Sequence, residues 1–391
     1  MTLVDEEQNF FLSQPHQPFF ILGIANALIM MLLFALSYKG ILSLQMDTLN
    51  FHTYTLIFTV FLNVFTGFLF TTFSRFCQTP SIESPYYTRI FFTNLIGSVL
   101  FIYGALSINL VMQVGMLILL LSQFFIVYKL HVIFKEGQAA DKKDAFWILV
   151  ANYFGLFGHL LFICSNFISE LQSVAINISF YLYLIFLTFA VAQRMIPFFS
   201  HSYEIKDEKL LIRTFVFLTL KTIFSAFDIL VGEIIIDVIL GLYLLREFIS
   251  WKFTPLTSHA ILWVLHLGLF WLPTALLLSA MSLTAELMLG TSFYFLGVHL
   301  IAIGFLTTIL IGFGTRVTLG HSGQAPNADT FAVGLFFFIQ VVVILRALLS
   351  FNVAFEWNLP FLFDISFSAW LVLFLLWGAR YGKVLIFGTK M

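Results

Sequence analysis

Histidine is the residue type in this sequence best suited to chemistry, and the 391 residues include nine of them. Neutral imidazole is the commonest metal ligand among protein side chains, and both haem iron and copper are held by histidines. An ionisable side chain inside a membrane is costly to bury and is usually kept for a function. The alternative for each histidine alone is a hydrogen-bonded contact between two helices.

Predicted depth in the membrane sorts most of the histidines into two groups. The group in the predicted outer half is the candidate haem site and consists of His52 and His299, with His159 nearby. The group toward the predicted cytoplasmic side is the candidate site for copper or a second haem and consists of His16, His201, His259 and His321. His266 shares a helix face with His259 and could serve either group. His131 lies in a charged loop, where we expect it to be solvated.

Two acidic residues are predicted to lie inside the membrane. Glu233 and Asp237 are four residues apart and therefore share one helix face. Their position predicts a proton path or a cation site. The alternative is a pair that is neutralised by protonation or by Lys221 in the adjoining hairpin.

Three arginines are candidate cofactor contacts. Arg346 could bind a haem propionate, because a guanidinium holds a carboxylate through two parallel hydrogen bonds. It could equally be an ordinary anchor near the end of a helix. Arg194 and Arg316 each lie near a predicted cytoplasmic histidine, where basic residues are also favoured by membrane topology alone.

Composition predicts the element that must position these residues. The chain is 60% hydrophobic and only 10% charged, against roughly 25% charged residues in soluble domains. This difference excludes a soluble protein, and the net charge of −1 argues against nucleic acid as a partner. The two cysteines cannot form a haem attachment motif, so any haem must be held without a covalent bond, as b-type haem is.

The chain has twelve apolar runs of the length needed to cross a bilayer as a helix, which is about 20 residues. They predict an all-α, polytopic membrane bundle that forms a single domain over residues 1–391. The predicted spans are 18–38, 51–73, 90–109, 111–134, 145–166, 174–199, 211–226, 229–247, 258–280, 292–314, 329–350 and 365–387. Region 211–247 could also be one long helix.

The distribution of basic residues favours twelve spans. With that count, 16 of the 19 Lys and Arg residues fall on one side, which the positive-inside rule assigns to the cytoplasm. Both termini are then cytoplasmic. The acidic residues 5–7 do not fit a signal peptide, so the first apolar segment is expected to be a retained span. We find no pair of broken helices that would indicate an inverted repeat.

Five sequence blocks, in order through most of the chain, resemble those of the NnrS family. The last is the most specific, because it contains His299, Arg316 and the run Gly320-His321-Ser322-Gly323. The blocks are QPHQPFF (14–20), FHTYTLIFTVFLNVFTGFLF (51–70), AQRMIPFFS (192–200), WVLHLGLFWLP (263–273) and HLIAIGFLTTILIGFGTRVTLGHSGQAP (299–326).

The resemblance implies a twelve-helix protein of the bacterial inner membrane that contains haem and copper and is linked to nitric oxide, denitrification and nitrosative stress. It also implies a role for the residues that match the family's characteristic histidines and arginines, which are His52, His266, His299, His321, Arg194 and Arg316. Two positions depart from the family. Tyr54 and Thr55 stand where many members continue His-x-His-Glu, and Gln17 stands where many have Arg.

Three functions fit these observations. The first is a membrane haem or haem–copper protein that binds, senses or chemically converts nitric oxide. The second is a turnover enzyme of the haem–copper oxidase or nitric oxide reductase type, but the sequence has no adjacent His-His pair of the kind those enzymes usually carry. The third is a proton-coupled secondary transporter that uses the intramembrane histidines with Glu233 and Asp237. The sequence does not indicate an electron donor.

Overall fold

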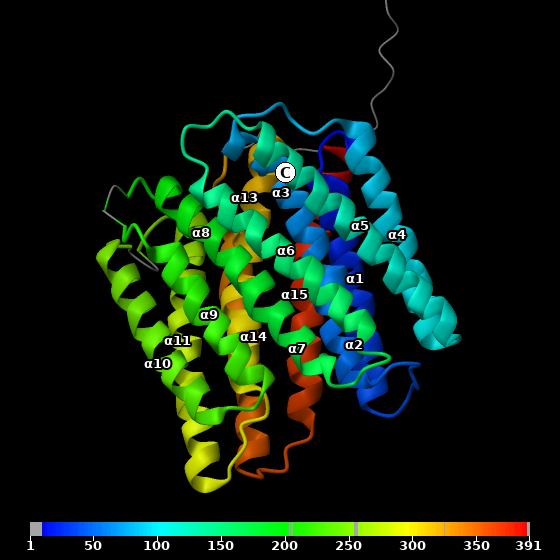
Figure 1. Cartoon of the computed structure of the whole chain (residues 1–391), viewed down its shortest axis with the longest axis vertical. Helices are drawn as coiled ribbons and strands as arrows, with labels where there is room; N and C mark the ends of the chain where they lie inside the picture. Colours follow the sequence, from blue (N-terminus) through cyan, green and yellow to red (C-terminus); the bar gives the residue numbers. More distant parts are fainter. Residues whose placement is uncertain (1–9, 203, 205, 254–256, 324, 389–391) are drawn as a thin grey trace, which may run out of the picture. The chain divides into compact units, whose positions relative to one another are not determined.

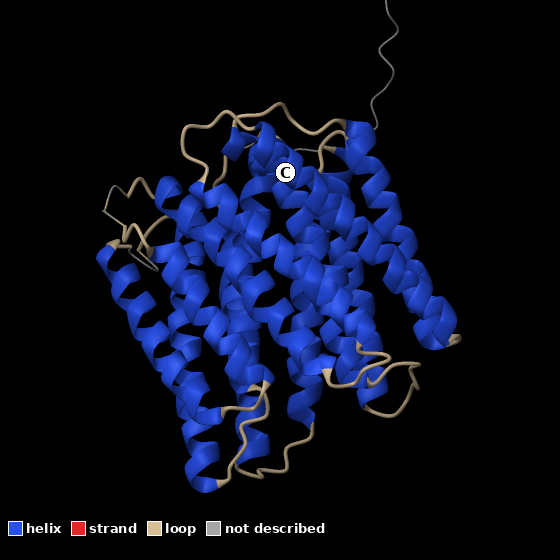
Figure 2. Ribbon diagram, viewed as in Figure 1, coloured by secondary structure: helices blue, strands red, loops and turns tan. Residues whose placement is uncertain are grey.

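The computed structural model describes residues 10–202, 204, 206–253, 257–323 and 325–388. The described residues form helices and connecting loops and no strand (Figure 2), which confirms the predicted all-α fold. The acidic residues 5–7 and Lys390, which entered the topology prediction, lie outside the described residues.

Each predicted span coincides with one helical segment (Figure 1), because each apolar run must satisfy its backbone polar groups internally. A short 3₁₀ helix, η1 (Phe10–Leu12), precedes them. The segments are α1 (His16–Tyr38), α2–α3 (Thr48–Cys77), α4 (Ser84–Leu106), α5 (Asn109–Glu136), α6 (Lys143–Cys164), α7–α8 (Leu171–Phe199), α9 (Leu210–Ala226), α10 (Leu230–Ser250), α11 (Ala260–Leu289), α12–α13 (Leu296–His321), α14 (Thr330–Ala354) and α15 (Phe361–Phe387).

Ten of these segments, among the described residues, are long and apolar enough to cross a membrane, so the chain is a multi-pass membrane protein. The other two are α9, which has only 17 residues, and α10, which carries four charged side chains. They are separate helices joined at residues 227–229, so region 211–247 is a hairpin and not one long helix. Their crossing of the membrane and the cytoplasmic position of the termini stay predictions.

Three segments contain a stretch of π-helix, and these stretches are evenly spaced. They are η2 (Leu56–Phe61), η3 (Ile178–Ile185) and η4 (Leu300–Thr307), so each begins 122 residues after the one before. The α-helices that follow η3 and η4 both have 14 residues, and Arg194 and Arg316 are the ninth residue of each. This spacing indicates that a pattern of helical segments recurs along the chain.

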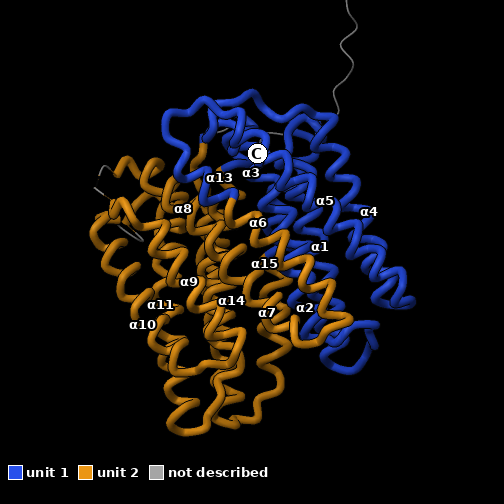
Figure 3. Tube along the Cα trace, viewed as in Figure 1, with its two compact units in different colours: residues 1–149, 317–325, 374–391 blue, residues 150–316, 326–373 orange. Residues whose placement is uncertain are grey.

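The contacts of the described residues divide the chain into two compact units, which Figure 3 colours separately. Unit 1 comprises Met1–Leu149, Val317–Ala325 and Phe374–Met391. Within it, the carbonyl of Thr59 in η2 accepts hydrogen bonds from the side-chain amides of Asn26 (3.0 Å) and Asn63 (2.7 Å). Side chains therefore satisfy a backbone group that the wider π turn leaves available.

Unit 2 comprises Val150–Arg316 and Pro326–Leu373 and therefore holds α7 to α12 and α14. Within it, α6 lies directly against η3. A Cβ added at Gly158 would lie 2.2 Å from the Ser179 hydroxyl oxygen, so only glycine permits this approach.

Candidate functional site

The structure brings two histidines of the predicted cytoplasmic group together within unit 1. His16 is the first residue of α1 and His321 is the last residue of α13 (Thr308–His321). Their ring centroids lie 4.8 Å apart, with 45° between the ring planes. His16 is buried, and its Nδ1 has no hydrogen-bond partner among the described residues. The pair therefore combines a close approach with an unused ring nitrogen.

Local packing explains why His16 is held at this position. A Cβ added at Gly67 of α3 would lie 2.9 Å from the Phe19 Cβ and 3.2 Å from the His16 Cα, so glycine allows the start of α1 to touch α3 (Leu62–Cys77). The ring of Phe20 packs edge-on against His16, with 5.8 Å between the centroids. The buried start of α1 is therefore well fixed by its apolar neighbours.

The donor set of the pair fits copper. Two imidazoles in contact can occupy neighbouring positions around one metal ion, and imidazole suits copper. The described residues contain no group of three or more His, Cys, Asp and Glu side chains that could hold a metal. A structural zinc site normally takes four such ligands. The two-histidine set is therefore poorer for structural zinc than for copper.

The other two histidines of the predicted cytoplasmic group belong to unit 2. His201 is exposed in the turn after α8 (Phe186–Phe199) and has a positive φ of 50°. His259 is exposed and caps the start of α11. The site of four histidines stays a prediction. His131, expected in a loop, instead lies in the last two turns of α5, on an exposed face.

His299 lies at the end of α12 (Leu296–His299) in unit 2 and has two partners for one ring nitrogen. Its Nδ1 is 2.9 Å from the carbonyl oxygen of Phe295 and 3.0 Å from Nη2 of Arg346. The carbonyl can only accept, and the guanidinium can only donate. The two hydrogen bonds therefore require opposite protonation of Nδ1. With the proton on Nδ1 and donated to the Phe295 carbonyl, Nε2 is the nitrogen that carries the lone pair, which is the usual tautomer of a ligating histidine.

Arg346 is buried, and it makes hydrogen bonds near the start of α12, the helix that carries His299. Its Nη1 donates to the Ser350 hydroxyl (2.7 Å), and its Nη2 lies 3.3 Å from the carbonyl oxygen of Tyr294. The Ser350 hydroxyl donates to that carbonyl as well (3.2 Å). Arg346 is therefore not a solvated anchor, and sequence reasoning missed the contact with His299. A contact between Arg346 and a haem propionate stays a prediction.

The other two members of the predicted haem site lie in different units. His52 lies on α2 (Thr48–Thr55) in unit 1, where its ring packs against Phe34 with 4.2 Å between the centroids and 30° between the planes. His159 lies on α6 in unit 2 and is fully buried. The convergence of His52, His159 and His299 on one haem stays a prediction.

Comparison with known protein families identifies the family to which the chain belongs. A family model described as "NnrS protein" matches residues 10–387, which is nearly the whole chain. The chain belongs to the NnrS family. No curated protein matches the chain. Membership of the NnrS family suggests a membrane protein that is related to nitric oxide and associated with haem and copper.

Three residues that match the family's blocks lie within helices of unit 2 or at its boundary, and two of them contact the end of α8 or the segment after it. Nε2 of His266 lies 2.7 Å from the Ser200 hydroxyl, and its ring stacks on Phe253 at 4.3 Å. The guanidinium of Arg316 lies 3.9 Å above the ring of Phe199, and Arg194 is half-buried on α8. His266 thus makes the interhelical hydrogen bond that is the alternative to metal binding. Ser200 was not predicted, although it ends the NnrS-like block 192–200.

The intramembrane acids share one cation. Nζ of Lys221 on α9 lies 2.6 Å from Glu233 Oε2 and 2.9 Å from Asp237 Oδ2, both on α10. The ammonium also lies 5.6 Å from the ring centroid of Tyr181 in η3. The predicted contact of Lys221 with the pair is therefore confirmed, although one positive charge does not cancel two ionised carboxylates.

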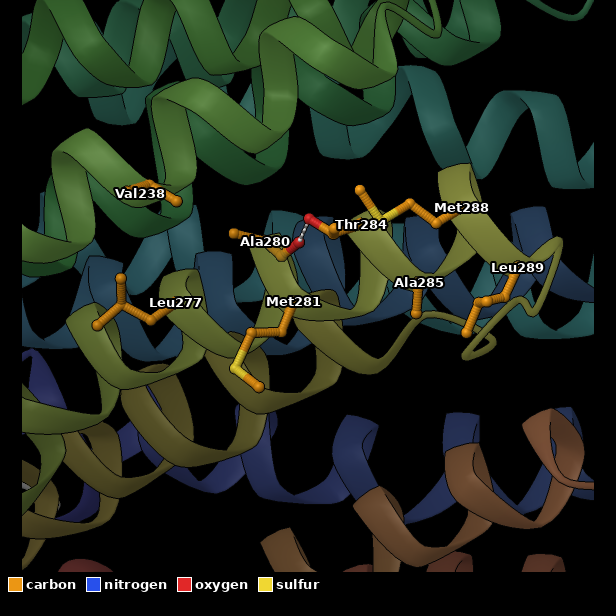
Figure 4. A pocket seen from close by; sticks show the side chains of 8 residues that line it. All are labelled: Val238, Leu277, Ala280, Met281, Thr284, Ala285, Met288 and Leu289. Carbon is orange, nitrogen blue, oxygen red and sulfur yellow. Dashed lines mark hydrogen bonds between the residues drawn. The ribbon is translucent and has the colours of Figure 1, made fainter.

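A groove of about 510 Å³ lies between α10 and α11 (Figure 4). One face of α11, from Leu277 to Leu289, forms most of it, and Val238 of α10 lies across from that face. The only hydroxyl in the lining belongs to Thr284, and it donates to the Ala280 carbonyl (2.7 Å). The walls are therefore suited to an acyl chain rather than to a haem or copper ligand.

Proposed function

We propose that the chain is an integral membrane haem–copper protein that handles nitric oxide, by binding it or converting it at a histidine-ligated haem, and so relieves nitrosative stress. The observation that carries the proposal is the His16–His321 pair, because a buried imidazole with an unpartnered Nδ1 beside a second imidazole is suited to a metal. Membership of the NnrS family supports the same cofactors. We propose the inner membrane of a bacterium as its location, with the lipid bilayer as its surroundings.

His299 is the proposed haem ligand for which the structure gives the most support. Its Nδ1 can donate to the Phe295 carbonyl, which orients the ring and places the lone pair on Nε2, as in a ligating histidine. Bound haem supplies an iron atom that takes up diatomic gases at an axial position. When Nδ1 carries its proton, Nη2 of Arg346 can no longer donate to it, and a haem propionate is the acceptor that we propose for this guanidinium. His52 and His159 are the other proposed ligands.

His16 and His321 are the proposed copper ligands, and both sit at helix ends within unit 1. Burial of His16 excludes water from one side of the pair, and a histidine binds a metal through its neutral imidazole. His201, His259 and His266 remain candidates for further ligands. Arg194 and Arg316 are proposed cofactor contacts, and the described partner of Arg316 is the ring of Phe199.

The test is anaerobic addition of nitric oxide to the full chain, purified in detergent from cells supplied with haem and copper. We expect a haem Soret band that shifts on addition of the gas and is lost from His299→Ala. His131→Ala is the matched control, because His131 is exposed on α5, and it should behave as the wild type. A haem-replete preparation without a Soret band would contradict the proposal. Gas consumption with a chemical reductant, compared with haem-free protein, then separates conversion from binding.

A further inference from the structure

The hairpin of α9 and α10 carries three buried ionisable side chains whose formal charges do not cancel. Lys221 contributes one positive charge, and Glu233 and Asp237 each contribute a negative charge when ionised. The exposed fractions of the three side chains are 2%, 11% and 0%. A net negative charge in these surroundings is unfavourable by several kcal/mol. One more positive charge must therefore be bound for the cluster to be stable.

Asp237 is the member of the cluster whose binding capacity is not used. Its Oδ2 accepts from Lys221, but its Oδ1 is buried and has no hydrogen-bond partner among the described residues. The Ser279 hydroxyl faces this carboxyl and can donate to it, but a neutral hydroxyl does not cancel the excess negative charge, and a buried excess charge carries a large desolvation penalty. Protonation of this carboxyl removes the excess charge and the penalty together.

The surroundings favour a proton over a metal cation. The ammonium of Lys221 already fills the space between the two carboxylates, at 2.6 and 2.9 Å. The neighbouring elements add hydroxyl groups to the cluster and no further charge. These groups are Tyr181 of η3, Ser225 of α9 beside it, and Ser279 of α11, which faces Asp237. A hard cation such as Ca²⁺ needs six or more oxygen ligands, which this cluster does not offer around Oδ1.

We propose that Asp237 binds an exchangeable proton inside the bundle, with Lys221 as a fixed countercharge and Glu233 as the route from water. Glu233 is the only one of the two acids with an exposed edge, and it lies one helical turn nearer the α9–α10 turn than Asp237. Both carboxylates are bonded to the same ammonium. A proton that reaches Glu233 can therefore pass to Asp237 while the total charge stays constant, and Lys221 holds both groups in place.

The test is infrared spectroscopy of the purified full chain near neutral pH in H₂O and D₂O. We expect a carboxylic acid C=O band that shifts in D₂O and is absent from Asp237→Asn. In Glu233→Gln the band should persist, and its shift after transfer to D₂O should develop at least several-fold more slowly. Asp207→Asn is the matched control, because Asp207 is an ion-paired carboxylate in a loop, and it should keep the band unchanged.

Three results would overturn the proposal. The wild type could lack the band, the band could survive in Asp237→Asn, or added Na⁺ or K⁺ could abolish it in the wild type, which would identify a metal cation site. If Asp237→Asn does not fold, labelling of wild-type protein with an apolar carbodiimide replaces it, because this reagent adds to protonated carboxyls in apolar surroundings. Mass spectrometry should then find the adduct on Asp237, and an unlabelled Asp237 would contradict the proposal.

Discussion

The histidine pair of unit 1 and the ion cluster of unit 2 bury polar groups in the same kind of apolar bundle by different means. His16 and His321 are imidazoles, which can be buried without a charge. The group that remains without a hydrogen-bond partner is Nδ1 of His16. Lys221, Glu233 and Asp237 neutralise each other in part, and the unused group is a carboxylate oxygen. The first arrangement suits a soft metal ion, and the second suits a proton.

The comparison teaches that burial alone does not identify a metal site. Asp237 is more deeply buried than either histidine of the pair, yet its partner is an ammonium group. What separates the two sites is the chemistry of the group that remains without a partner. The predictions below change that group in one site and use the other as a reference.

The largest expected effect follows from removing the cation of unit 2. Lys221→Met leaves two carboxyl groups buried without their countercharge, and we expect a loss of about 3–5 kcal/mol in stability. Thermal unfolding of the detergent-solubilised protein measures it. The triple variant Lys221→Met, Glu233→Gln, Asp237→Asn should recover most of the loss, because a buried ion cluster can often be replaced by neutral groups at little cost. If Lys221→Met is as stable as the wild type, the ion cluster does not contribute to the stability of the fold.

The next effect follows from removing one imidazole of unit 1. His16→Ala and His321→Ala should each reduce bound copper to near the background amount, while the haem content stays unchanged. Copper analysis of each purified variant checks this. His131→Ala should retain the wild-type copper content. If His201→Ala or His259→Ala also loses copper, the predicted site of four histidines replaces the pair.

The contact between Arg346 and His299 is intermediate between the two sites, because it pairs an imidazole with a charged group. Arg346→Met removes the guanidinium that we propose binds a haem propionate, and it removes one of the two groups that donate to the Tyr294 carbonyl before α12. We expect haem affinity to fall by about 10–100-fold, as on loss of other groups that orient a metal ligand. A titration of haem-free protein with haem measures the affinity. Ser350→Ala, which only loosens Arg346, should have a smaller effect, and an equal effect would argue for a purely structural role.

The smallest effect concerns Asp207, which lies outside the predicted spans and pairs with Arg213 near the start of α9. Asp207 accepts hydrogen bonds from the Lys209 backbone N–H (2.9 Å), the Tyr243 hydroxyl (2.8 Å) and Arg213, and these contacts lower the pKa of its carboxyl. A lowered pKa means that Asp207 stabilises the fold above its unfolded value of 3.8 and loses this contribution as pH falls through the folded value. Asp207→Asn should therefore lose about 1 kcal/mol at neutral pH.

Thermal unfolding of Asp207→Asn and the wild type across a pH series checks that effect. The difference between the two proteins should close as the solution becomes more acidic than the folded pKa of Asp207. A difference that stays constant at all pH values would show that the contact does not depend on the charge of Asp207, and would weaken its use as the reference for the buried cluster.

The sequence predicts the helices well and the contacts among polar groups poorly. Apolar runs are long in this chain, so all twelve predicted spans coincide with helical segments, and the α9–α10 hairpin follows from the positions of Lys221 and Asp228. The π-helical stretches leave no such signal, because they differ from α-helix only in their hydrogen bonding. Their 122-residue spacing is visible only in the structure.

Contacts between distant residues depend on packing that hydropathy does not encode. Helical depth grouped His16 with His321, and the structure places them together, but depth cannot show that His201 and His259 are exposed on unit 2. It also cannot show that Arg346 reaches His299, since 47 residues separate them. The sequence did indicate Lys221 as the cation that pairs with Glu233 and Asp237. It could do so because Lys221 lies in the same hairpin as the two acids.

The haem and copper contents of the purified wild-type chain test the central proposal most directly. The protein should be extracted from membranes of cells supplied with both cofactors, and its haem spectrum and copper-to-polypeptide ratio measured on the same folded sample. The proposal predicts a Soret band together with copper in a stoichiometric amount. Folded protein that contains neither haem nor copper would contradict it.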